Sequence, residues 1–75
     1  MEDQATHLWT LQREDREVSC LVRLVPYGIE IDIAYDGAAV ATRVFATGEE
    51  AMAWADATRT DRMGRGWKAV PPTAT

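Results

Sequence analysis

The chain has 75 residues, of which 47% are hydrophobic and 27% charged, and twelve acidic against eight basic side chains give a net charge of −4. A chain this short buries only about 60% of its unfolded surface, which excludes a second domain or a deep enclosed cavity. Its negative charge disfavours non-specific binding to nucleic acid, its single cysteine excludes an internal disulfide, and no apolar run is long enough to span a membrane. We therefore expect one cytoplasmic domain over 7–70, with flexible ends at 1–6 and 71–75.

The first two strands are predicted at 7–14 and 17–25, on either side of a charged turn. A turn at Asp15-Arg16 places Trp9 opposite Val22, so that large apolar side chains of both strands share one face of the sheet. The turn contains no glycine, and its position depends on this apolar match alone.

The clearest strand covers 29–35, where large apolar residues alternate with polar or small ones. Alternation with a period of two predicts a strand with one buried face. A four-residue loop over 25–28 contains proline and glycine, and it pairs Leu24 with Ile29. A loop of three residues would instead bring an arginine among the isoleucines, so the four-residue loop is preferred.

Asp36 and Gly37 follow directly and are typical of a two-residue type I′ turn, whose central residues both take positive φ. We therefore expect a fourth, antiparallel strand at 38–46. In the register that this turn sets, Ile33 lies opposite Val40 and the apolar residues of both strands coincide.

A helix is predicted after the strands, because Thr47 and Glu50 match a capping box and 51–63 is rich in helix-forming residues. Gly64 is a natural stop. We expect the segment after the helix to fold back so that Trp67 covers the core.

The predicted fold is therefore α+β: a four-stranded antiparallel meander followed by one C-terminal helix packed on one face (ββββα). One helix covers only one face of such a sheet, so the other face is left open. A row of alternating charge, Arg23, Glu30 and Arg43, is expected to cross this open face, with larger apolar residues beside it. The candidate interaction face consists of Leu8, Leu21, Arg23, Glu30, Asp32, Arg43 and Phe45.

Catalytic chemistry is not indicated by the sequence. His7 is the only histidine, and we expect it on the helix-covered face. Cys20 lies mid-strand on the apolar face, where a thiol behaves as a small hydrophobic group. Glu30 and Asp32 share a face, but a flat sheet offers no cleft for the substrate that a glycosidase would hold between them. We expect no enzyme activity, no metal and no cofactor.

The interpretation that follows is a small protein–protein interaction module or accessory subunit, whose partner is a second copy or another protein. The contact would use the open sheet face or a strand edge, since the first and fourth strands of the meander both have free backbone groups.

Two alternatives remain. The strand order resembles, in topology only, the four-strand-plus-helix repeat of the PUR and Whirly proteins, and the resemblance implies single-stranded nucleic-acid binding on the sheet face. No motif accompanies it, and such binding needs aromatic platforms in a positive groove. The second alternative is a small acidic inhibitor of another protein. A candidate basic patch at the end of the helix consists of Arg59, Arg62, Arg65 and Lys68.

Overall fold

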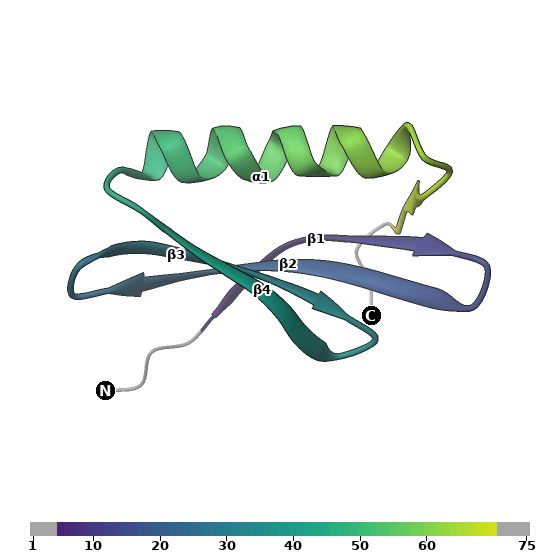
Figure 1. Cartoon of the computed structure of the whole chain (residues 1–75), viewed down its shortest axis with the longest axis horizontal. Coiled ribbons are helices and arrows are strands. Elements are labelled where there is room, and N and C mark those ends of the chain that lie inside the picture. Colours follow the sequence, from purple (N-terminus) through teal and green to yellow (C-terminus); the bar gives the residue numbers. More distant parts are fainter. Residues whose placement is uncertain (1–4, 71–75) are drawn as a thin grey trace, which may run out of the picture.

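The computed structural model describes residues 5–70 and confirms the predicted fold class. Four meander strands and a short fifth strand form one antiparallel sheet in the order β4-β3-β2-β1-β5. The helix α1 lies across one face of this sheet (Figure 1). No helix in the described part of the chain is long and apolar enough to cross a membrane. The elements are β1 (Thr6–Arg13), β2 (Arg16–Val25), β3 (Gly28–Tyr35), β4 (Ala38–Phe45), α1 (Gly48–Met63) and β5 (Lys68–Ala69).

The hairpin between β2 and β3 has the predicted register, with Leu24 opposite Ile29 and Val25 opposite Gly28. Gly28 has a φ of 149°, and a Cβ atom on it would lie 2.4 Å from the carbonyl oxygen of Phe45. Glycine is therefore required here by both backbone conformation and space.

The turn between β3 and β4 also forms as predicted, since Asp36 and Gly37 have φ values of 50° and 88°. Beyond the turn, however, a β-bulge shifts the register, so that Ile33 pairs with Ala41 and not with Val40. The register predicted from Val40 onward is wrong by one residue.

The shift at this bulge exchanges the two faces of β4, because successive side chains of a strand point to opposite sides. Val44, expected in the core, pairs with Glu30 on the open face and is 43% exposed. Val40, the extra residue of the bulge, stays beside the helix-side groove but is 57% exposed. Arg43 and Phe45, expected on the open face, lie on the helix side, where both contact the Trp54 ring.

The turn between β1 and β2 lies one residue earlier than predicted. Glu14 and Asp15 form it, Glu14 adopts a φ of 58°, and Trp9 pairs with Cys20 instead of Val22. The pairing is thus shifted by two residues, which leaves Trp9 on the predicted face.

A second bulge, between His7 and Trp9, changes the faces at the start of β1. His7 pairs with Leu21 and so lies on the open face, opposite to the prediction. Leu8, expected on the open face, packs against the core cluster. As on β4, one extra residue reverses the side to which the strand's side chains point.

The core lies between the sheet and α1. Alanines on the sheet-facing side of the helix, Ala51 and Ala55, are buried and let the helix approach the strands closely. Four larger side chains beneath them are fully buried: Leu11, Val18, Cys20 and Ile31.

The ends of α1 lie where the sequence predicts, and one of the two hydrogen bonds of the predicted capping box is formed. The Thr47 hydroxyl accepts a hydrogen bond from the Glu50 amide at 3.1 Å, and Gly64 caps the last turn. Trp67 then folds back, with its ring centroid 6.0 Å from that of Tyr35. The chain continues into β5, a strand not predicted from the sequence. Of the segments predicted to be flexible, 1–6 and 71–75, only residues 5 and 6 are described, and Thr6, in β1, already pairs with Val22.

Candidate interaction surface along strand β4

The open face of the sheet carries a bonded polar cluster. Arg23 forms ion pairs with Glu30 and, at 3.7 Å, with Asp32. Asp32 in turn accepts a hydrogen bond of 2.7 Å from the Thr42 hydroxyl. Glu30 is only 7% exposed, although no helix covers this face. Two members of the predicted charge row therefore meet, and Val44 occupies the place expected for Arg43.

The other end of the open face is polar as well. His7 contacts the Thr10 hydroxyl, which is 3.0 Å from that of Ser19. Leu21 is half-buried between His7 and Asp32, its partners in the neighbouring strands. Of the large apolar residues predicted for this face, Leu21 alone lies there, so the apolar contact patch expected from the sequence is not assembled.

The edge of the sheet at β4 is exposed along almost its whole length. All residues from Ala38 to Val44 are exposed, and no strand among residues 5–70 lies on the outer side of β4. The strand has one charged residue, Arg43, and no proline. Edge strands normally carry several charges, prolines, bulges or a covering element that prevent pairing with another chain, whereas β4 has only Arg43 and the bulge at Val40.

The opposite edge differs from this one. The sequence predicted free backbone groups along the whole first strand, but β5 pairs with β1 at Leu11 and Gln12, and the Val70 amide donates to the Thr10 carbonyl at 3.0 Å. The edge of the first strand is thus partly covered, and β4 is the longer available edge.

A groove with a volume of about 370 Å³ runs between β4 and α1. Small residues on both walls, Ala41 on β4 and Ala57 on α1, leave this space open, with Trp54 beside them. Its far end contains Asp61 and Arg62, which form an ion pair of 3.1 Å with each other. The complete lining is Ile33, Tyr35, Val40, Ala41, Trp54, Ala57, Thr58, Asp61 and Arg62.

Arg43, two residues after Ala41 on the helix side of β4, contacts two aromatic rings. Its guanidinium carbon lies 5.5 Å from the centroid of Phe45 and 5.4 Å from that of Trp54. The rings themselves are 5.8 Å apart. Arg43 is exposed and forms no ion pair with any residue in 5–70. A guanidinium in contact with aromatic rings through its charge keeps N–H groups that can still bind an anion.

The predicted basic patch does not form one positive surface. Arg62 and Arg65 both donate to the same Asp61 carboxylate oxygen at 3.1 Å, and Arg62 also donates to the Tyr35 hydroxyl. Arg59 is half-buried on the helix, and Lys68 lies on β5. The arginines that nucleic-acid binding would need are therefore separated or paired with a carboxylate.

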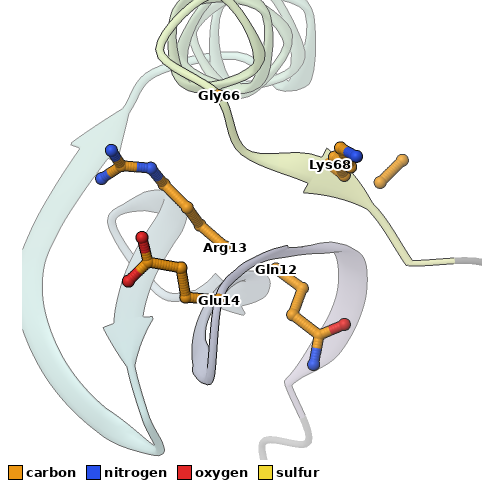
Figure 2. A pocket seen from close by; sticks show the side chains of 6 residues that line it. Gln12, Arg13, Glu14, Gly66 and Lys68 are labelled. Carbon is orange, nitrogen blue, oxygen red and sulfur yellow. The ribbon is translucent and has the colours of Figure 1, made fainter.

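A second pocket, also of about 370 Å³, lies between the β1–β2 turn and β5. Arg13 and Glu14 lie on one side of it, while Gln12 and Lys68 point away from them (Figure 2). The charged groups carry both signs and do not converge on one point, so the pocket offers no defined site for an ion.

Cys20 is buried, and desolvation, with a smaller contribution from the Asp32 charge, raises the pKa of its thiol from 9.0 to about 11. We expect the folded protein to react very slowly with a thiol reagent at about pH 8, and rapidly once denatured. The folded state binds the thiol proton of Cys20 more tightly than the unfolded state does, so the neutral thiol contributes to the free energy of unfolding. This contribution is complete below pH 9.0 and is lost as the pH rises to about 11. Fast labelling of native protein would contradict the core position of Cys20.

Sequence reasoning missed the groove and assigned Arg43 and Phe45 to the wrong face. The signal available was the small size of residues 41 and 57, since alanines at these positions leave space where the helix crosses the strand.

Residues 5–70 hold no group of three or more histidine, cysteine or carboxylate side chains able to bind a metal ion. No family model, curated protein or solved structure matches the chain.

Proposed function

We propose that this protein is a small, non-catalytic protein–protein interaction module that accepts a strand from its partner along β4. The observation that carries the proposal is the edge itself: an eight-residue strand exposed over seven positions, with one charged residue. A strand added to such an edge gains main-chain hydrogen bonds, while side-chain pockets beside it give selectivity. The groove between β4 and α1 is a pocket of that kind.

The edge supports this role better than the open face does. Polar groups of that face already bond to one another, as in the cluster of Arg23, Glu30, Asp32 and Thr42. A partner that covered them would have to match or break these bonds, and unmatched buried charge is costly. The partner at β4 is either a second copy, which would extend the sheet across a two-fold axis, or an extended segment of another protein.

Val40→Lys is expected to weaken strand addition by about tenfold, because it places a charge where an apolar side chain meets the incoming strand. Val40 is 57% exposed, so the fold should be unaffected. Leu24→Lys is the matched control, since Leu24 is 72% exposed but lies on β2, inside the sheet. The measurements are the solution mass across a concentration series and protection of the β4 amides from hydrogen exchange.

Either kind of partner gives a distinct result. Self-association through the edge predicts a dimer with protected β4 amides that Val40→Lys dissociates. A monomer directs the search to peptides, whose binding should protect the same amides. Association that Leu21→Asp disrupts and Val40→Lys leaves intact would assign the contact to the open face and contradict the proposal.

A further inference from the structure

We propose that the partner of β4 is an extended peptide of another protein that carries an apolar and an acidic residue separated by one position. This inference rests on the proposed strand addition and names the chemistry of the added strand. It combines three neighbouring features: the exposed edge, the groove beside Ala41, and the stacked guanidinium of Arg43.

The spacing follows from the geometry of β4. Ala41 and Arg43 pair with the buried residues Ile33 and Ile31, so both point to the helix side. Residues two apart on a strand share a face and are about 7 Å apart. An added strand lies about 4.8 Å from β4, and its helix-side residues therefore lie beside Ala41 and beside Arg43.

The position beside Ala41 favours an apolar side chain. Here the groove is lined by two small residues, Ala41 and Ala57, and also by Ile33 and Trp54. A volume of about 370 Å³ accommodates a leucine or an aromatic side chain. Burial of that side chain would supply the apolar part of the binding free energy.

The position beside Arg43 favours a carboxylate. Asp61 pairs with both Arg62 and Arg65, whereas no carboxylate within 5–70 pairs with Arg43. Phe45 and Trp54 fix the guanidinium in place, which reduces the side-chain entropy lost when an anion binds. A planar fork of N–H groups matches a carboxylate through two parallel hydrogen bonds.

A second copy of the chain does not meet this requirement with its own β4. The sequence of that strand, Ala-Ala-Val-Ala-Thr-Arg-Val-Phe, contains no acidic residue. Pairing two such strands would supply no carboxylate to either Arg43. The charge on β4 therefore favours an acidic peptide over self-pairing.

The experiment is a selection of random twelve-residue displayed peptides on the full chain, followed by affinity measurement with the strongest peptide made synthetically. We expect enriched peptides to carry the apolar and acidic pair in one of its two orders. Replacing the peptide's acid by its amide should lower the affinity for the wild-type protein about tenfold, and have little effect on Arg43→Gln. Arg13→Gln on β1, far from β4 in the sheet, is the matched control and should behave as wild type.

The possible failures are distinguishable. Selected peptides that protect β4 amides but show no preference for an acid would overturn the partner chemistry and leave strand addition intact. A dimer held through β4 that excludes all peptides would also overturn the partner chemistry and leave strand addition intact. If selected peptides bind without protecting β4, or if none is enriched and the chain is monomeric, both proposals are wrong. The amide-for-acid change in the peptide decides the outcome even if Arg43→Gln perturbs the protein.

Discussion

Replacement of Ile31 by aspartate is expected to abolish folding. Ile31 has no exposed surface and lies in the cluster that contacts α1 at Ala51 and Ala55. An unpaired carboxylate in this position costs more than the total stability of a 75-residue domain, roughly 4–11 kcal/mol. The expected result is loss of the near-ultraviolet circular dichroism signal and of the cooperative urea transition.

The neighbouring residue provides the control for this change. Asp32 points to the opposite face, where it accepts a hydrogen bond from Thr42 and pairs with Arg23. Asp32→Ala removes these contacts and should lower the free energy of unfolding by only about 1 kcal/mol. Similar costs for the two substitutions would mean that the two faces of β3 are not those described.

Gly28→Ala is expected to destabilise the protein by about 3 kcal/mol, the second largest effect of a single change. The φ of 149° is one that side-chain-bearing residues rarely adopt, and the added methyl carbon would lie 2.4 Å from the Phe45 carbonyl oxygen. Relief of that contact requires the end of β4 to move, since the obstructing atom belongs to the backbone. Urea unfolding followed by tryptophan fluorescence measures the loss.

The matched control is Gly48→Ala in the first turn of α1. A Cβ atom there meets nothing within 4 Å, and alanine is the better helix former. The free energy of unfolding of the Gly48→Ala variant should therefore be unchanged or slightly higher than that of the wild type. A loss at Gly48 equal to that at Gly28 would show that the cost comes from removing glycine in general and not from the geometry of the β2–β3 turn.

Elements with strong local chemistry could be predicted from the sequence. Asp36 and Gly37 specify a turn by their tolerance of positive φ, and Thr47 specifies a helix start by its hydroxyl acceptor. The second role of Asp36 could not be foreseen: its carboxylate accepts a hydrogen bond of 3.0 Å from the Glu17 amide on β2. Such contacts across the sheet depend on how far each strand extends, which local sequence does not determine.

The bulges could not be predicted for a related reason. Around Val40 the sequence is Ala-Ala-Val-Ala-Thr, in which small residues fit either face and no alternation opposes a shift of one residue. The regular register was preferred because it buried Val40 and Val44, yet in the structure Phe45 is half-buried against Trp54 instead. The larger aromatic contact therefore determines the face, and it involves a helix whose position the strand sequence does not contain.

The candidate site could not be predicted fully for the same reason, because it depends on where α1 lies on the sheet. Arg43 was recognised as a functional candidate, but its partner ring, Trp54, lies eleven residues later and on another element. The groove exists only because α1 crosses the sheet with Ala57 toward β4. Residue types suggested an interaction module, whereas the edge and groove that would perform this role required the tertiary arrangement.

The short strand β5 has a consequence for how the chain folds. Every meander pairing joins strands that are consecutive in the sequence, whereas Leu11 pairs with Ala69 across most of the chain. Local hairpins form quickly, and contacts between distant positions form more slowly because a long loop must close. We therefore expect the meander to be organised before β5 docks. The last pairing to form, only two residue pairs long, would also be the first to open.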